Sequence, residues 1–319
     1  MRIVFMGTPE FAVPSLKRLV EEGHEVVAVV TQPDRPKGRG KKMMPSAVKE
    51  AAHKLGIPVL QPERIRDSQW VAQIDALAPD LIVTAAFGQI LPRTILEIPM
   101  MGSLNVHASL LPAYRGAAPI HWALIRGESE TGVTIMRMDV GMDTGDMILQ
   151  EGIPITEKDN VDSLHEKLAT LGASLLVQAV ELIGLDPGAG TPQDHQAATY
   201  APLLKREHER IDWHKHADDV VNHIRGMNPW PGAYTLSTSG LLKIYEAEVY
   251  TVEEDGWTIR EDIPGMVVKI IPRHGFVVAT GMGHVLVKKV KPENGRIMKA
   301  DEFVRGYRLQ SGDYLGGSL

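Results

Sequence analysis

Two polar side chains, Asn105 and His107, end a short apolar run at residues 103–106. Residues two apart in an extended chain project to the same side, so this amide and this imidazole can face one ligand together. Side by side, they could hold a developing oxyanion, and the imidazole can also exchange a proton near neutral pH. Spacing alone favours the alternative that both side chains only satisfy backbone groups at the strand end.

A carboxylate flanked by glycines is the second candidate. Asp143 lies in the segment 139–146, where Gly141 and Gly145 permit a sharp bend that brings the carboxylate close to a ligand. Asp143 could orient His107 or take the proton that an attacking amine loses. The ligand pattern of a calcium loop is absent from this segment, and a Gly/Asp turn is by itself most often only a turn.

A basic segment follows the second apolar run. Residues 31–45 carry five cations against a single anion, Asp34. The cations are Arg35, Lys37, Arg39, Lys41 and Lys42. Prolines and glycines in this segment disfavour a stable helix. In a chain of formal net charge -6, such a loop suits contact with a phosphate backbone, although a solvated surface loop remains the alternative.

A second set of cations lies near the carboxyl terminus. Residues 265–300 are mostly basic, whereas residues 246–262 are mostly acidic. This segregation could give a small domain one basic and one acidic side, as expected of a nucleic-acid platform. Lys288, Lys289 and Lys291 are then the candidate contacts, although charged runs on strands are more often solvated faces.

The elements that must position these residues alternate between strand and helix. Continuous apolar runs, typical of parallel strands buried on both faces, lie at residues 3–6, 26–30, 81–86 and 103–106. Helical patterns lie near residues 46–55, 67–77, 119–126 and 161–183, and a hairpin-like pair covers 131–138 and 147–155. This order predicts an α/β fold with a doubly wound, mostly parallel, Rossmann-like sheet.

The amino-acid composition of the chain changes at Gly184. Residues 186–192 are rich in Gly and Pro, which is typical of a linker. One helical segment and five short β-rich runs follow, and they predict a small antiparallel, OB-like β-barrel. We therefore expect a catalytic domain over residues 1–185, a linker over 186–206 and a β-barrel domain over 207–319.

Composition excludes several classes of site. The chain has no Cys, so disulfides, thiolate catalysis and cysteine zinc sites are excluded. His208, His214 and His216 crowd one segment, but His214 and His216 would point about 200° apart on a helix, so no metal site is expected. Because no leader segment and no apolar stretch of roughly 18 residues is recognised, we expect a cytoplasmic protein.

Together the candidate catalytic residues are more specific than each alone. Asn105, His107 and the turn at residues 109–112, followed by Asp143, resemble the folate-dependent formyltransferases. The resemblance implies 10-formyltetrahydrofolate as formyl donor and no metal. It implies that Asn105 and His107 stabilise the tetrahedral oxyanion at the formyl carbon, and that Asp143 supports His107 and helps to remove the amine proton.

The same resemblance implies where folate binds. The residues that it assigns are Phe87, Gly88, Gln89, Ile90, Leu91, Ser109, Leu110, Leu111, Pro112, Asp139, Val140 and Gly141. A flat pterin with polar edges suits apolar walls and backbone groups.

The resemblance is closest to the members of this family that formylate the methionyl amine of initiator tRNA. It extends to residues 7–9, 31–45, 115–120 and 228–233. It implies that the basic loop enters the acceptor-stem end of the tRNA with Arg39 as its key cation. It further implies that the β-barrel domain contacts the tRNA, and that the protein serves translation initiation as a monomer.

Two alternatives remain open at this point. One is a formyltransferase for a small amine, either a ribonucleotide or an amino sugar nucleotide, and the other is a non-catalytic RNA-binding protein. The basic loop and the appended barrel argue against the first alternative, since a small acceptor needs neither. The intact set of Asn105, His107 and Asp143 argues against the second.

Overall fold

The computed structural model describes residues 1–37, 42–251 and 263–317. The chain forms two compact units. Unit 1 comprises Met1–Pro119, Glu130–Pro154 and His165–Pro202, and unit 2 comprises Ile120–Ser129, Ile155–Leu164 and Leu203–Leu319. The domain boundaries expected from composition stay a prediction.

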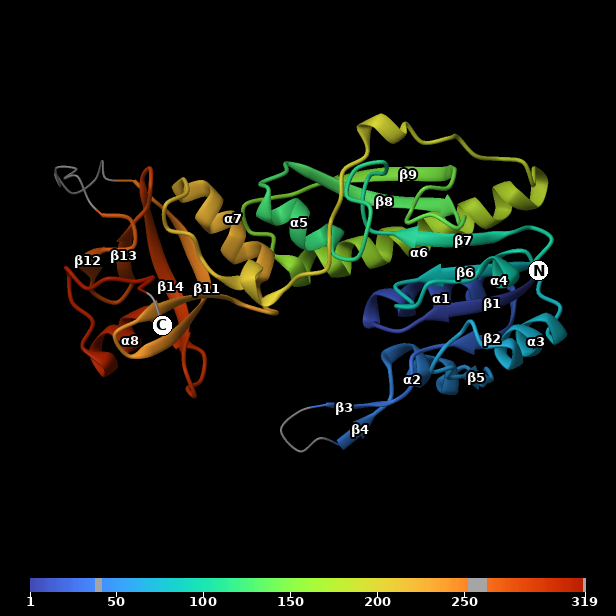
Figure 1. Ribbon diagram of the computed structural model, residues 1–319, viewed down its shortest axis with the longest axis horizontal. Coiled ribbons are helices and arrows are strands. Elements are labelled where there is room, and N and C mark those ends of the chain that lie inside the picture. The colour runs from blue at the N-terminus through green and yellow to red at the C-terminus, as the bar shows by residue number, and fades with distance from the viewer. Residues whose placement is uncertain (38–41, 252–262, 318–319) are drawn as a thin grey trace. The chain divides into compact units, whose positions relative to one another are not determined.

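A seven-stranded sheet lies at the centre of unit 1, in the order β5-β2-β1-β6-β7-β8-β9 (Figure 1). Its strands are β1 (Arg2–Gly7), β2 (Glu25–Val30), β5 (Val59–Leu60), β6 (Leu81–Ala85), β7 (Ser103–His107), β8 (Glu130–Arg137) and β9 (Met147–Pro154). The strands from β5 to β7 pair in parallel, and β8 and β9 continue the sheet antiparallel. The predicted mostly parallel, doubly wound sheet is therefore confirmed.

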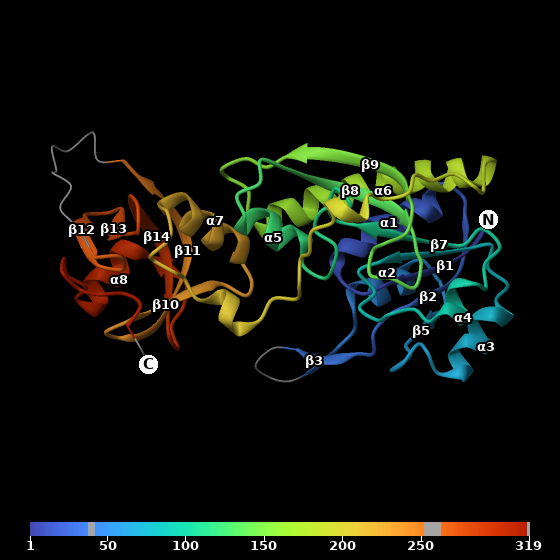
Figure 2. The ribbon, with the colours of Figure 1, turned by 45° about the horizontal axis from the view of Figure 1, so that its top comes forward.

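Helices connect these strands and cover the sheet. The helices of unit 1 are α1 (Val13–Glu21), α2 (Ala47–Lys54), α3 (Ser68–Ala76), α4 (Arg93–Leu96) and, from His165 on, α6 (Val161–Leu185). The helix α5 (Pro119–Ile125) belongs from Ile120 on to unit 2. One face of the sheet packs Val4 and Ile82 against Ile74 of α3 and Ile95 of α4. The helix α6 runs along the sheet (Figure 2).

A close approach of α6 to β7 decides which way the polar residues of β7 point. A Cβ added to Gly172 of α6 would lie 2.8 Å from Cγ1 of Val106 and 3.5 Å from Cγ1 of Val133. Val106 therefore faces α6. Because side chains alternate along a strand, Asn105 and His107 project from the opposite face.

The long helix α6 corrects one expectation. By length and composition it could cross a membrane, although no such stretch was expected. Within its most apolar window, 56% is buried, and Leu168, Leu176 and Ile183 have no exposed surface. A leucine face packed in this way is typical of a helix in the core of a folded domain.

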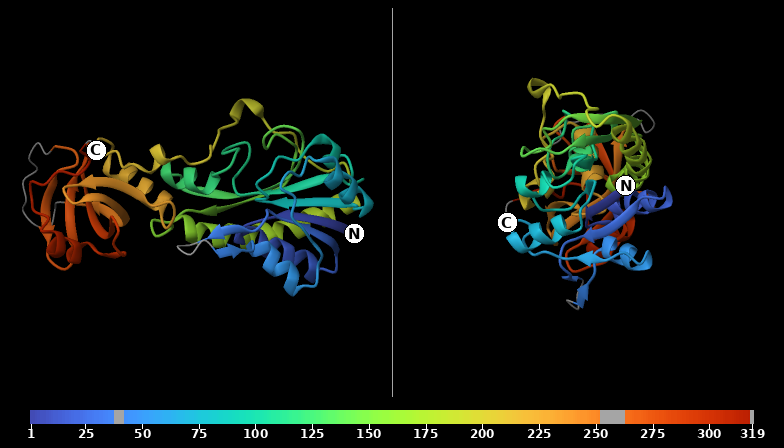
Figure 3. Two further views of the ribbon diagram at one scale, coloured as in Figure 1. Left: turned by 60° about the horizontal axis from the view of Figure 1, so that its bottom comes forward. Right: turned by 90° about the vertical axis from the view of Figure 1, so that its right-hand side faces the viewer.

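The basic segment has more structure than expected. Its ends form a ribbon of β3 (Arg35–Lys37) and β4 (Lys42–Met44), paired antiparallel. The ribbon projects from unit 1 between the end of β2 and the start of α2 (Figure 3). Its base is fixed by a 2.7 Å hydrogen bond between the hydroxyls of Thr31 and Ser46.

Unit 2 contains a small antiparallel sheet in the order β10-β11-β14-β13-β12, with β15 paired to β14. The strands are β10 (Ala233–Ser237), β11 (Gly240–Tyr250), β12 (Val267–Ile271), β13 (Gly275–Ala279), β14 (His284–Pro292) and β15 (Met298–Lys299). The helices α7 (Ala217–Met227) and α8 (Ala300–Tyr307) share its core through Val220, Ile224 and Phe303. The predicted second, β-rich domain is confirmed, whereas α8 was not predicted.

Candidate active site

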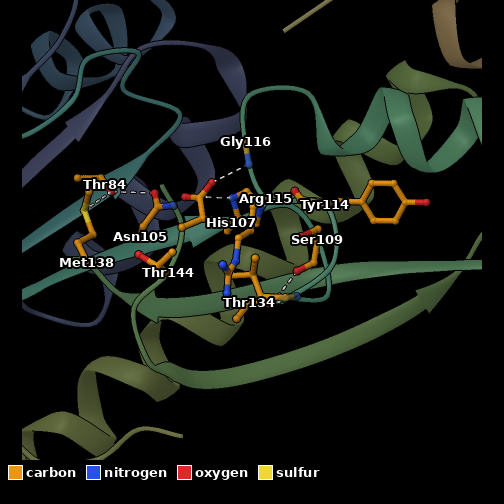
Figure 4. A network of polar contacts seen from close by, with 12 residues as sticks. Thr84, Asn105, His107, Ser109, Tyr114, Arg115, Gly116, Thr134, Met138 and Thr144 are labelled. Carbon is orange, nitrogen blue, oxygen red and sulfur yellow. Dashed lines mark hydrogen bonds and ion pairs between the residues drawn. The ribbon is translucent and has the colours of Figure 1, made fainter. Parts of the chain in front are cut away.

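The amide of Asn105 has a defined orientation. Thr84, on the neighbouring strand β6, donates its hydroxyl to Asn105 Oδ1 at 2.8 Å (Figure 4). Thr84 and Asn105 are register partners in the parallel pair, so the sheet itself sets this contact. With its oxygen held, the amide presents its two N–H donors elsewhere, which is the arrangement that an oxyanion needs.

The side chain of His107 is buried, with 6% of its surface exposed. Its Nε2 lies 3.1 Å from the carbonyl oxygen of Tyr114. A carbonyl only accepts, so Nε2 carries the hydrogen and donates it. In the neutral ring, Nδ1 is then the unprotonated nitrogen, and it faces Asp143 Oδ1 at 3.8 Å.

Asp143 is held by the backbone of a distant loop. Its Oδ2 accepts the N–H of Gly116 at 2.8 Å. Gly116 has φ +114, and an added Cβ would lie 2.8 Å from the carbonyl oxygen of Ala201, so only glycine suits this position. The 3.8 Å from Asp143 to His107 is an ion-pair distance and too long for a direct hydrogen bond.

The structure therefore brings the three predicted catalytic residues together. Asn105 and His107 share one face of β7, and Asp143 reaches Nδ1 of His107 from the loop after β8. Sequence reasoning missed Thr84 and the role of Gly116. Thr84 could have been found from the sequence, because it is the one polar residue in a buried apolar strand. Gly116 lies in the segment 115–120, which carries part of the resemblance.

The residues predicted to bind folate divide into two groups. Phe87, Leu91 and Leu111 are buried in the core, and the Ser109 hydroxyl donates to the Ala113 carbonyl at 2.6 Å. The side chain of Gln89 is also engaged, with the N–H of Ile65 and the carbonyl of Pro62. These side chains build the loops. Backbone groups of Phe87, Ser109 and Leu111 are also hydrogen-bonded within the fold, so this group shapes the loops more than it offers polar groups to a ligand.

The second group is open to solvent. Ile90 is 86% and Val140 73% exposed, while Leu110 and Pro112 are half-buried and Gly88 and Gly141 are exposed. The Asp139 carboxylate caps its own loop by accepting from the N–H of Gly141 and the Thr144 hydroxyl. Exposed apolar side chains beside exposed glycine backbone fit a flat ligand with polar edges, and the folate assignment stays a prediction.

The predicted tRNA contacts in unit 1 are only partly described. Arg35 is exposed on β3. Lys37 and Lys42 pair through their backbones where β3 ends and β4 begins, but their side chains lie outside what the structure describes, as do Arg39 and Lys41. Asp34 is neutralised, because its carboxylate accepts from Lys49 Nζ at 2.7 Å. The hydrogen bonds from Lys49 and Gln61 hold the pKa of Asp34 below its usual value.

The predicted contacts in unit 2 carry less free charge than expected. Lys288 forms an ion pair with Glu248, and Lys289 lies 3.0 Å from Glu246. The expected segregation into a basic and an acidic side therefore fails at these two pairs, because β11 and β14 are antiparallel neighbours. The other five anions of the acidic run, at residues 253–262, lie outside the described residues. Lys291 lies opposite Lys243, and burial lowers the pKa of Lys243.

The described part of the chain holds no group of three or more His, Asp or Glu that could bind a metal ion.

Comparison with known proteins gives matches over nearly the whole chain. A family model described as formyl transferase matches residues 1–180, and one for the formyl transferase C-terminal domain matches residues 203–308. The methionyl-tRNA formyltransferase of Pelotomaculum thermopropionicum is 53% identical over 316 residues, which are 99% of each chain. That of Moorella thermoacetica is 50% identical over 99% of each chain.

Solved structures share the fold at lower identity. HypX from Aquifex aeolicus in complex with tetrahydrofolic acid has a TM-score of 0.64 at 16% identity, over 100% of this chain and 51% of that one. WlaRD, a sugar 3N-formyl transferase, has a TM-score of 0.64 at 21% identity, over 90% of this chain and 97% of that one. At this identity the likeness concerns the fold alone.

Proposed function

The chain belongs to the formyl transferase family, and from that premise we propose that it acts as a methionyl-tRNA formyltransferase. It transfers the formyl group of 10-formyltetrahydrofolate to the α-amine of methionyl-initiator tRNA, for translation initiation. The observation that carries this assignment is the 53% identity to such an enzyme over 99% of both chains. No metal takes part in the proposed reaction.

The proposed role of Asn105 follows from its orientation. The amine nitrogen attacks the formyl carbon, a C–N bond forms, and the carbonyl electron pair moves to oxygen. Because Thr84 holds Asn105 Oδ1, the Asn105 N–H donors are available to that oxyanion. A hydrogen bond that forms only as charge develops lowers the barrier without tightening substrate binding.

We propose that His107 and Asp143 transfer a proton. The expectation that His107 also donates to the oxyanion is not carried into this proposal, because its Nε2 hydrogen is committed to the Tyr114 carbonyl. With Nε2 donating to the Tyr114 carbonyl, Nδ1 of neutral His107 can take the proton that the amine loses after attack. The imidazolium then lies beside the Asp143 carboxylate, which stabilises it. When the carbonyl re-forms and the bond to N10 of the folate breaks, the same proton can pass to N10.

Positioning supplies the rest of the acceleration. An α-amine titrates near roughly 8, so it needs only modest help to become the neutral nucleophile. Holding it against the formyl carbon replaces a bimolecular encounter by an intramolecular one. We propose that the β3–β4 ribbon and unit 2 hold the tRNA for this purpose, through Arg35, Lys37, Arg39, Lys41, Lys42, Lys288, Lys289 and Lys291. Such a protein is cytoplasmic, and we propose that it acts as a monomer.

The assay that tests this function measures tetrahydrofolate release from 10-formyltetrahydrofolate with three acceptors in parallel. These are charged initiator tRNA, its uncharged form, and an amino sugar nucleotide. Release is expected only with charged initiator tRNA. Faster release with the amino sugar nucleotide would favour the small-amine alternative, and no release with any acceptor would favour a non-catalytic RNA-binding protein.

Removing charge from the basic ribbon is expected to weaken tRNA use and leave chemistry intact. With Arg39, Lys41 and Lys42 replaced by Ala, the KM for charged tRNA should rise, because phosphate contacts are lost. The slope of log(kcat/KM) against log[salt] should fall by roughly one per lost contact. Replacing Lys54, at the end of α2, is the control for general charge. An unchanged salt slope would show that the ribbon does not touch the tRNA.

A further inference from the structure

Part of the stretch predicted as a linker packs against the loops of the candidate site. Thr191 and Met147 exchange backbone hydrogen bonds of 2.8 and 2.9 Å. Further along, the Arg115 N–H donates to the Thr199 carbonyl at 2.9 Å, and the Ala201 N–H donates to the Arg115 carbonyl at 2.7 Å. Residues 191–201 therefore run alongside both the Asp143 loop and the Arg115–Gly116 segment, all within unit 1.

Gln193 is the buried polar residue of this stretch, with 6% of its surface exposed. Its Nε2 donates to two carbonyl oxygens of the catalytic loop, that of Asp143 at 2.9 Å and that of Gly145 at 2.7 Å. Its Oε1 accepts from Nε of Arg115 at 3.1 Å and from Nη2 of Arg115 at 2.6 Å. One amide thus joins the loop to a guanidinium that is itself only 2% exposed.

These partners leave the amide a single orientation. A guanidinium has only donors and a carbonyl oxygen only accepts. If the amide of Gln193 were turned over, N–H groups would meet N–H groups at Arg115, and oxygen would meet two carbonyl oxygens at Asp143 and Gly145. Buried polar groups left unpaired in this way are costly, so Arg115 fixes which end of Gln193 faces the loop.

The backbone of Asp143 has an uncommon conformation. Its φ is +54, in the left-handed region, which Asp enters more readily than most non-glycine residues but at some cost in free energy. Its carboxylate is held by the Gly116 N–H, and its backbone carbonyl is held by Gln193. These two contacts come from different segments and act on opposite ends of the same residue.

We propose that Gln193 is a positioning residue for Asp143, oriented by the buried guanidinium of Arg115. It does not touch the reacting atoms. It holds the backbone conformation that points the Asp143 carboxylate at Nδ1 of His107. This inference rests on the proposed function, in which Asp143 stabilises the protonated His107.

The test replaces Gln193 in the full-length protein by Met or by Glu. Met keeps the size of the side chain and removes all its polar contacts, whereas Glu still accepts from Arg115 but cannot donate to the two loop carbonyls. Both variants are expected to lower kcat by about 10- to 100-fold, because a small misplacement of a reacting group has effects of this order. KM for charged tRNA and for the folate should change little. Gln196→Met, the same replacement at an exposed site in the same stretch, is the control and should keep wild-type kcat.

A double-mutant cycle with Asp143→Asn separates positioning from a general structural role. If Gln193 acts through Asp143, adding Gln193→Met to Asp143→Asn should lower kcat by less than twofold further, because interacting residues are not additive. The inference would be overturned if Gln193→Met lowered kcat in the Asp143→Asn protein as much as it does in the wild type, or if Gln193→Met alone kept a kcat within twofold of wild type. Either result would leave the proposed function standing. Wild-type activity of Asp143→Asn would instead overturn the role of Asp143, and the inference with it. If Gln193→Met does not fold, Gln193→Glu takes its place in the cycle.

Discussion

Replacing Asn105 with Ala is expected to lower kcat for formyl transfer by about two to three orders of magnitude, the usual effect of losing one oxyanion donor. The reason is local. The Asn105 oxygen is engaged by Thr84 at 2.8 Å, so the amide is oriented, with its N–H groups directed away from Thr84, before the substrate arrives. A donor that needs no reorganisation at the moment of reaction acts mainly on kcat, and KM should change little.

Two matched variants separate the donor from its orientation. Asn105→Asp keeps the shape but replaces the donor by an acceptor, so it should be at least as inactive as Asn105→Ala. Thr84→Val is nearly isosteric and keeps the Asn105 amide but releases its oxygen, and a loss of about tenfold is expected for a donor that is present but loosely held. Single-turnover formylation of charged tRNA measures the chemical step directly. If Asn105→Asp kept near-normal turnover, Asn105 would not be the oxyanion donor.

The sheet of unit 1 could be predicted because burial on both faces leaves a simple pattern. Residues 81–85 and 103–107 each form the strand that their apolar run indicates, and parallel pairing follows from the helices between them. Elements with few buried residues gave no such pattern. The β3–β4 ribbon has exposed Met43 and Met44, so no period-two apolar face marks it. The helix α8 is different, because Ala300, Phe303 and Val304 pack on the core of unit 2 and keep a helical spacing. Its sequence carried a signal that the prediction did not use.

The candidate site was predictable where its residues lie on one element and not where it depends on contacts between elements. Asn105 and His107 are two apart on β7, so their common face follows from strand geometry. The contact of Gln193 with the Asp143 carbonyl spans 50 positions, and no local pattern encodes it. For the same reason, the distribution of charge along the chain did not predict the charge pairs of unit 2, where antiparallel pairing sets Glu246 opposite Lys289.

Replacing His107 with Ala is expected to lower kcat by about two to four orders of magnitude, the range for a lost general acid–base residue. The contacts of the ring indicate which nitrogen of His107 exchanges the proton. Nε2 is committed to the Tyr114 carbonyl, so only Nδ1, beside Asp143, can exchange a proton during the reaction. Added imidazole should restore part of the activity of His107→Ala, because the buried site loses a ring of that size. No rescue at any imidazole concentration, together with normal folding, would indicate that His107 orients groups and does not carry a proton.

Asp143→Asn is expected to lower kcat nearly as much as His107→Ala does, because the two residues act in the same step. The Asn side chain can still accept the Gly116 N–H that holds Asp143 at 2.8 Å, so the loop should keep its place while the charge is lost. Without the carboxylate at 3.8 Å, the imidazolium that forms at His107 is no longer stabilised. A loss of about 100-fold corresponds to about 2.7 kcal/mol at the transition state, within reach of one ion pair shielded from water.

The double variant His107→Ala/Asp143→Asn should then be scarcely slower than His107→Ala alone. Asp146→Asn removes an exposed carboxylate from the same loop, and it should keep wild-type kcat. If it lowered kcat as much as Asp143→Asn does, the reaction would need the general negative charge of the loop and not the contact with His107.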